Sequence, residues 1–350
     1  MSAIETRGTD REAQQGAERA AEQAAEQAAD RAARRAAILD RSGIAIPFTG
    51  VLLLGAFLAP NFLTGANIRG ILINTAILAV VGYGMTFAIT IRGLDLSVGS
   101  VAALGSVVAA ATVNSAGPIL GIAAGLAVGA AAGLVNGLLI ALVRVPPFVA
   151  TLAMLSAARG AALVFAGGQR IQVGNASFRS LATTSILGIP LPFWLALALG
   201  AIAYAVLERV RWGRHVCAVG GNPEAAVEAG LRRTRIIIAV YVLSGIAAGI
   251  SGVLVTAQLG TVDATPILGL ELQAIAVAVL GGTSLRGGTG NIIGTLAAAL
   301  VLGMISSGLN LLNVPGYYQY LALGAVLLLA LALDAARIRL RSAGRGEATS

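Results

Sequence analysis

Asp95 is the residue of this chain with the clearest potential for chemistry. It lies in the segment Gly-Leu-Asp-Leu-Ser-Val-Gly-Ser at 93–100, which places one carboxylate and two hydroxyls between two long apolar stretches. A carboxylate near membrane depth is typical of a solute or proton path. It also suits a helix start, because an aspartate accepts backbone N–H groups there, and a helix is expected from Leu96. The two roles are compatible, and the sequence leaves both open.

The other reactive side chains exclude several classes of chemistry. All 24 basic residues are arginine, and the chain has one histidine, His215, and one cysteine, Cys217. Without lysine there is no Walker A loop and no Schiff base, and too few ligands remain for a zinc site or an internal disulfide. We therefore expect no catalysis by this chain and no cofactor bound to it.

The glycine-rich segment at 281–290 resembles a phosphate-binding loop. It lacks the lysine and the preceding strand of such a loop, so nucleotide binding is not expected. We expect instead a tight turn whose backbone approaches another helix or subunit.

A short helix is expected in the polar loop 209–235, between two clusters of arginines. Asn222 suits the N-cap, Pro223 the first helical position and Gly230 the stop. A capped amphipathic helix of this kind lies on lipid headgroups or docks into another protein. The composition of the segment favours neither.

The elements that must hold these segments are predicted to be membrane helices. The chain has 350 residues, of which 57% are apolar and 11% charged, and its mean hydropathy is +0.85. About a quarter of the residues of a soluble domain are charged, so the bilayer is the expected solvent. The predicted fold class is all-α, a polytopic bundle of about ten transmembrane helices. The apolar segments lie at 44–59, 71–91, 96–114, 119–143, 148–166, 191–207, 236–258, 272–282, 292–312 and 318–333.

The eighth segment is too short to span a bilayer unless it packs within protein, which leaves ten spans or eight with two re-entrant pieces. Arginine positions support ten, because cytoplasmic loops are enriched in arginine. With the amino terminus inside, ten spans place 20 arginines inside, Arg159 within a span, and only Arg69, Arg170 and Arg179 outside. We therefore predict that both termini are cytoplasmic. In a membrane protein the location of the arginines matters more than the net charge of +8, so this charge does not indicate a nucleic-acid partner.

The polar ends complete the predicted organisation. Residues 1–41 form an Ala-, Glu- and Arg-rich cytoplasmic tail, helical or disordered. Residues 42–336 form the transmembrane domain, with 209–235 as its cytoplasmic loop, and 337–350 form a basic cytoplasmic tail.

Two patterns within the spans concern helix packing. Glycines recur every four residues from 121 to 137, which predicts a packing seam within the bundle or between subunits. The segment 133–148 is echoed at 307–317, and ten spans would place the two copies in opposite directions. Two inverted five-helix halves explain the echo, as in many transporters. The alternative is that glycine-rich membrane helices resemble one another by composition.

Five motifs, in this order along the chain, resemble the permease subunit of bacterial ABC importers of the ribose and monosaccharide type. They are the segments 93–100, 145–152, 220–226, 279–285 and 308–312. The resemblance covers about 61–334.

The resemblance implies a type II importer of the bacterial plasma (inner) membrane. Two permease copies, identical or merely similar, would form the path. A cytoplasmic ATP-binding cassette subunit would bind ATP and magnesium, and an extracytoplasmic sugar-binding protein would deliver a monosaccharide such as ribose. Membrane lipid would surround the bundle. The helix that couples the permease to the ATPase would contain Gly221, Asn222, Pro223, Glu224, Ala225, Glu228 and Gly230.

On the same interpretation, alternating access needs only a weakly polar path, because a high-affinity site in the path would slow release. The residues predicted to line it are Asn74, Thr86, Asp95, Ser97, Ser106 and Thr112. The main rival is an ion-coupled secondary transporter of a small polar solute, which would be active without an ATPase. A structural or assembly protein of the membrane is a third hypothesis.

Overall fold

The described part of this computed structural model comprises residues 45–262 and 269–319, with residues 321, 322, 324, 325, 328 and 332. The helices described here belong to one unit of the chain, 46–334. The predicted tails at 1–41 and 337–350 lie outside the described residues, as does much of the last predicted span.

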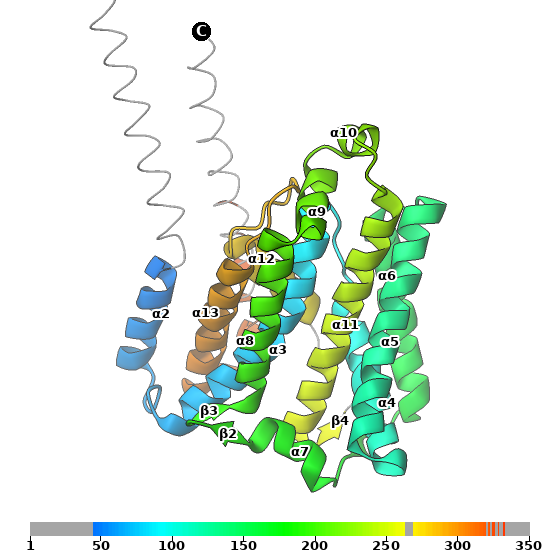
Figure 1. The fold of residues 1–350 in the computed structure, drawn as a ribbon. Helices are drawn as coiled ribbons and strands as arrows, with labels where there is room; N and C mark the ends of the chain where they lie inside the picture. Colours follow the sequence, from blue (N-terminus) through cyan, green and yellow to red (C-terminus); the bar gives the residue numbers. More distant parts are fainter. Residues whose placement is uncertain are drawn as a thin grey trace, which may run out of the picture. The chain divides into compact units, whose positions relative to one another are not determined.

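Helices form most of the described chain (Figure 1). The long ones are α3 (Gly65–Thr90), α4 (Val98–Ala116), α5 (Pro118–Leu138), α6 (Pro147–Ala166), α8 (Leu191–Tyr204), α11 (Arg233–Leu259) and α13 (Ile292–Leu311). The π-helical turns η1 (Leu139–Val143) and η2 (Ala205–Arg209) continue α5 and α8. The shorter helices are α2 (Ala45–Leu58), α7 (Ala176–Thr183), α9 (Arg211–Gly221), α10 (Pro223–Glu228) and α12 (Leu270–Leu280).

The strands are pairs of two residues each. β1 (Ile171–Gln172) pairs antiparallel with β4 (Thr261–Val262), and β2 (Ser185–Ile186) pairs antiparallel with β3 (Ile189–Pro190). The predicted all-α membrane fold is therefore confirmed.

Seven helices in the described part of the chain are long and apolar enough to cross a bilayer. They are α3, α4, α5 with η1, α6, α8 with η2, α11 and α13. Two further apolar helices, α2 and α12, are shorter. α12 has 11 residues and is about 16 Å long, against a hydrocarbon core of about 30 Å, so it is too short to span, as the sequence predicts.

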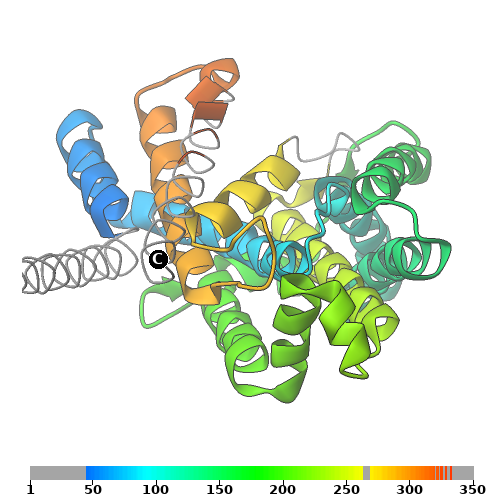
Figure 2. The same cartoon turned by 90° about the horizontal axis from the view of Figure 1, so that it is seen from above.

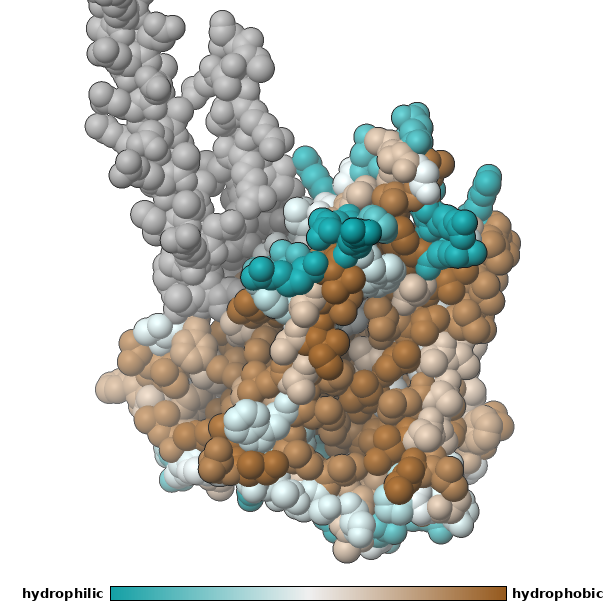
Figure 3. All heavy atoms as spheres, in the orientation of Figure 1, coloured by the Kyte–Doolittle hydropathy of each residue, from teal (hydrophilic) through white to brown (hydrophobic). Residues whose placement is uncertain are grey.

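The arginine-rich loops meet at one end of the bundle. Arg92, just after α3, donates hydrogen bonds to the carbonyls of Gly220 and Gly221, at the end of α9. Arg144 after η1 and Arg232 before α11 line a cavity that Arg92 also lines. We call this the arginine end; in Figure 3 hydrophilic residues gather there beside a broad hydrophobic band. The predicted placement of these loops on one side is confirmed.

The opposite end holds the strands and α7. There Arg69, in the first turn of α3, contacts Ser185 of β2. α5 with η1 ends at the arginine end, at Arg144, while α13 begins there, just after the turn 281–290. The two copies of the sequence echo therefore run in opposite directions, as an inverted repeat requires.

The innermost helix is α3, whose side chains are all buried from Thr75 to Thr90. It packs against α8, α11, α12 and α13, which surround it in the view along the bundle (Figure 2). By contrast α6 exposes most of its length, including Val164 and Phe165, to the hydrophobic surroundings.

The glycine seam lies inside this unit, between α5 and α11. An added Cβ at Gly129 would lie 2.2 Å from the carbonyl oxygen of Gly245, and one at Gly245 would lie 2.1 Å from that of Gly129. At Gly133 a Cβ would meet the carbonyl oxygen of Tyr241 at 2.2 Å. Of the two predicted locations, the structure shows the one within the bundle.

Candidate functional site

Asp95 is the centre of a buried polar cluster, which we call the Asp95 cluster. Its Oδ1 accepts hydrogen bonds from the backbone N of Ser97 at 3.1 Å and from Ser97 Oγ at 2.6 Å. Its Oδ2 accepts one from Ser244 Oγ of α11 at 2.7 Å. Asn136 Nδ2 of α5 donates to Ser97 Oγ at 3.0 Å. All four side chains are buried, so three segments far apart in the chain share one set of polar contacts.

The Asp95 cluster lies at membrane depth. Ser244 is eleven residues beyond Arg233, the first residue of α11, which corresponds to about 16 Å along the helix, near the middle of a hydrocarbon core of about 30 Å. The chain between Arg92 and Ser97 therefore turns back from the arginine end into the bundle. Irregular backbone at this depth needs partners within the protein, and Thr151 Oγ1 of α6 supplies one by donating to the carbonyl of Leu94 at 3.2 Å.

The predicted helix start at Leu96 needs a correction. α4 begins at Val98, and Ser97 is its N-cap residue, without a side-chain capping bond. Asp95 does accept the N–H of Ser97, but its second oxygen bonds Ser244 of another helix. The carboxylate therefore joins helices as well as supporting a helix start.

Two atoms near the Asp95 cluster are buried without a hydrogen-bond partner among the described residues. They are Asn136 Oδ1 and the hydroxyl oxygen of Tyr241. A buried polar group without a partner costs about 1–3 kcal/mol. The Asp95 cluster thus combines a carboxylate with polar atoms that are not fully satisfied, which is more typical of functional sites than of packing.

The other predicted path residues lie apart from Asp95 and Ser97. Thr86 Oγ1 of α3 lies 2.8 Å from Thr295 Oγ1 of α13, and both are buried. Ser106 Oγ donates to carbonyls of its own helix and of Gly252 in α11, at 2.8 and 2.9 Å. Thr112 Oγ1 donates to the carbonyl of Val108 at 2.8 Å. Asn74 is exposed, and its Oδ1 accepts from Gln258 Nε2 at 3.3 Å.

Sequence reasoning missed Asn136, Ser244 and Thr295 as members of these polar contacts. Each is a polar residue in an otherwise apolar helix, which is a signal for function or helix association in a membrane. Asn136 also lies in the repeated segment. The sequence does not show how the helices are aligned against one another, and this alignment brings Asn136 and Ser244 to the Asp95 cluster and Thr295 to Thr86.

The loop 209–235 contains two helices, where sequence reasoning expected one. α9 buries Val216 and Val219 and exposes Arg211 and Arg214. α10 is the expected short helix. Asn222 Oδ1 accepts the N–H of Ala225 at 3.0 Å, and Pro223 opens the helix.

The predicted stop at Gly230 is also confirmed, with a left-handed φ of 82°. Ala226 is the one buried side chain of α10, while Glu224, Ala225 and Glu228 are exposed. The outer face of α10 is therefore open to a partner.

The junction between α9 and α10 is fastened to the end of α3. Arg92 Nε donates to the carbonyl of Gly220 at 2.5 Å, and the N–H of Gly288 donates to the carbonyl of Thr90 at 2.8 Å. An added Cβ at Gly220 would lie 1.7 Å from the carbonyl oxygen of Thr90. Segment 281–290 is therefore the predicted tight turn, and its backbone approaches another helix of the same chain.

A comparison with protein families supplies the decisive observation. Residues 67–331 match the family of permease components of the branched-chain amino acid transport system. The chain belongs to this permease family.

Sugar-transport permeases match this chain along most of their length. The permease is 42% identical over 294 residues to the ribose import permease protein of Bacillus subtilis, covering 82% of this chain and 91% of the relative. It is 38% identical over 307 residues to the L-arabinose ABC transporter permease protein of Azospirillum brasilense, covering 87% and 91%. No solved structure matches the permease.

The resemblance drawn from the five motifs is therefore confirmed. The relatives are transport permeases rather than enzymes, and the permease is a multi-pass protein of the inner membrane.

Proposed function

We propose that this permease forms the membrane path of an ATP-driven importer for a monosaccharide such as ribose. The observation that carries the proposal is the likeness to ribose and L-arabinose permeases over most of their length. Alternating access would move the sugar along a weakly polar path that includes Asn74, Thr86, Asp95, Ser97, Ser106 and Thr112.

The proposed partners are a cytoplasmic ATP-binding cassette subunit, an extracytoplasmic sugar-binding protein and a second permease copy. The exposed outer face of α10 supports docking of the ATPase there, because a short capped helix between two arginine clusters presents Glu224 and Glu228 outward. ATP and magnesium would bind to the partner subunit.

The ion-coupled alternative is favoured by one observation, the buried carboxylate of Asp95 at membrane depth. The two hypotheses differ in what the chain does alone. Proteoliposomes containing the permease alone, or with its ATPase and sugar-binding protein, separate them. We expect ribose uptake only with both partners and ATP inside the vesicle; uptake by the lone chain along a proton or sodium gradient would replace the importer by the alternative.

Glu224→Arg is expected to lower the affinity for the ATPase subunit at least about tenfold, because it reverses the charge at the centre of the proposed contact. ATP-driven uptake should fall in parallel. The measurement is co-purification of the ATPase with the permease, followed by uptake. Glu224→Asp is the matched control and should retain both; equal ATPase binding by Glu224→Arg and the original permease would place the contact elsewhere.

Cys217 reports on which side of the membrane the arginine end lies. It is the chain's one cysteine, on α9, and is partly buried. We expect a membrane-impermeant maleimide to label it in inside-out vesicles and not in intact spheroplasts. In Cys217→Ser/Leu187→Cys, which moves the thiol to the opposite end, the pattern should reverse. Labelling of Cys217 in spheroplasts would place the arginine end outside the cell and would contradict the proposed cytoplasmic termini.

Labelling of Cys217 should also depend on pH. Burial, and secondarily the negative charge of Glu208, raise the pKa of the thiol above its usual value. The reactive thiolate is therefore scarcer near neutral pH than for a free cysteine, and the labelling rate should keep rising with pH beyond the usual thiol pKa. A rate profile that levels off at the usual thiol pKa would contradict this environment.

A further inference from the structure

A large cavity lies at the arginine end, beneath α10. Its volume is about 960 Å3, and its walls come from the end of α3, the turn between η1 and α6, the inner side of α10 and the start of α11. Five arginines line it, and no aspartate or glutamate does. They are Arg92, Arg144, Arg232, Arg233 and Arg235.

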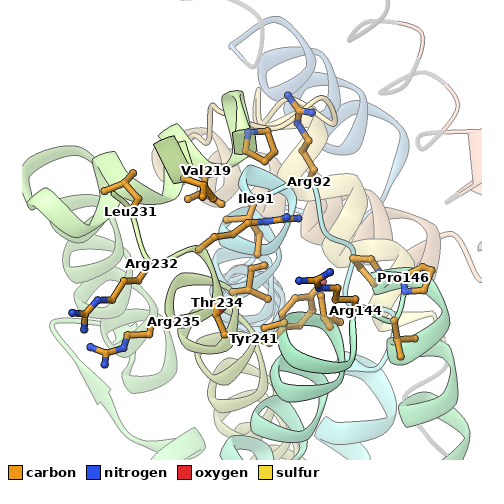
Figure 4. A pocket seen from close by; sticks show the side chains of 18 residues that line it. Ile91, Arg92, Arg144, Pro146, Val219, Leu231, Arg232, Thr234, Arg235 and Tyr241 are labelled. Atoms are coloured by element: carbon orange, nitrogen blue, oxygen red, sulfur yellow. The ribbon is translucent and has the colours of Figure 1, made fainter. Parts of the chain in front are cut away.

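The arginines approach the cavity from different walls. In Figure 4, Arg144 lies beside Pro146, while Arg232 and Arg235 lie side by side at the opposite side of the view. Arg92 is bonded to Gly220 and Gly221. The side chains of the other four have no hydrogen-bond or ion-pair partner within the described residues. Cations gathered without counter-charges repel one another, so the site favours an anion.

Backbone conformation provides a second, independent observation. Arg92 and Arg144 have left-handed φ values of 62° and 65°, at the ends of α3 and η1. Glycine is the usual residue at such a position, and another residue there costs about 1 kcal/mol or more. A basic residue one turn earlier would complement the helix dipole without this cost. At Arg92 the side chain serves the contact with Gly220 and Gly221, and at Arg144 it lines the cavity.

The surroundings show what kind of anion fits. Leu142 and Val143, directly before Arg144, are 61% and 65% exposed, and Phe148 at the start of α6 is 55% exposed. The cavity also contains Ile91, Ile140 and Ile237 among its lining residues. A basic cavity that continues onto an exposed apolar surface, at the depth where the spans begin, matches a phospholipid with its headgroup in the cavity and its chains along the helices.

We propose that the cavity binds the phosphate of an anionic phospholipid, whose acyl chains lie along Leu142, Val143 and Phe148. This site is separate from the proposed solute path, and it lies on the inner side of α10, opposite the outer face proposed for the ATPase. The lipid would fill the space between α10 and the spans and neutralise the arginines that line it.

The test titrates the full-length permease, purified in a non-ionic detergent, with phosphatidylglycerol or with phosphatidylcholine, and counts bound lipid by native mass spectrometry. Arg144→Gln/Arg233→Gln removes two cavity arginines that belong to different segments, the turn after η1 and the start of α11. Its affinity for phosphatidylglycerol should fall roughly 25-fold, about fivefold for each arginine. Arg211→Gln/Arg214→Gln has the same change of charge at the same end, on exposed residues outside the cavity, and should bind phosphatidylglycerol like the original chain.

Three results would overturn the proposal. One is equal phosphatidylglycerol binding by the two double variants. Another is displacement of the lipid by millimolar inorganic phosphate, which would make the cavity a site for a free anion. The third is loss of ATPase binding with lipid binding unchanged, which would assign the arginines to the protein partner.

A measurement on the unmodified chain covers the case in which the glutamine variant does not fold. A photoactivatable phosphatidylglycerol should crosslink to peptides from 140–148 and 231–237, and crosslinks confined to other segments would refute the site. Arg144→Lys/Arg233→Lys, which retains the charges, should keep the crosslinks.

Discussion

Asp95→Ala is expected to lower the free energy of unfolding of the permease by about 2–3 kcal/mol and to abolish most solute uptake. The substitution leaves the hydroxyls of Ser97 and Ser244 and the N–H of Ser97 without their acceptor at membrane depth. Each unpaired buried group costs about 1–3 kcal/mol, and hydrogen bonds within membranes average somewhat less. Thermal unfolding in detergent measures the first effect, and uptake per folded permease in proteoliposomes with both partners measures the second.

Asp95→Asn separates the two effects, because the amide keeps one acceptor oxygen and nearly the same volume. We expect it to recover most of the stability lost in Asp95→Ala. Uptake that stays low in this stable variant would mean that the negative charge itself takes part in transport. Asp95→Ala with unchanged unfolding temperature and uptake would remove the residue from any central role.

Gly245→Ala is expected to destabilise the permease by about 3 kcal/mol, at the upper end of the cost of overpacking. The new methyl group would lie 2.1 Å from the carbonyl oxygen of Gly129, more than about 1 Å inside normal contact. That atom belongs to backbone and cannot rotate away, so α5 and α11 must separate and lose the close approach that holds membrane helices together.

Gly160→Ala on α6 is the matched control. It introduces the same methyl group into a membrane helix, at a position with no neighbouring atom within 4 Å, and should leave stability unchanged or raise it slightly, because alanine favours helix. The two unfolding temperatures are compared in the same detergent. Similar values for Gly245→Ala and Gly160→Ala would contradict tight backbone packing at the seam.

Seven of the ten predicted spans coincide with helices long enough to cross a bilayer, because the bilayer imposes a length and a charge asymmetry that can be read from sequence. The arginine loops, the short α12 and the caps of α10 all follow from such local rules. α9 was missed because its glycine and arginine residues, Gly213 and Arg214 among them, suggest a loop. Its helical form depends on burying Val216 and Val219 against the bundle.

The Asp95 cluster was only half predictable. Asp95 and Ser97 are prominent because they interrupt apolar sequence, and they are neighbours in the chain. Asn136 and Ser244 join them across 39 and 149 residues, through a helix register that glycine contacts between α5 and α11 determine. Thr86, Ser106 and Thr112 are also polar residues in apolar sequence, yet their hydroxyls bond to groups outside the Asp95 cluster. The rotation of each helix about its axis determines which groups its side chains can reach.

The attachment of Gly220 to the end of α3 has a mechanical consequence. Besides the hydrogen bonds of the Arg92 side chain, the contact there is between backbones, because a Cβ at Gly220 would lie 1.7 Å from the carbonyl oxygen of Thr90. A displacement of α10 that moves the end of α9 would therefore press on the end of α3, and Asp95 follows Thr90 by only five residues. Events at the protein's surface can thus reach the carboxylate at membrane depth along a short stretch of chain.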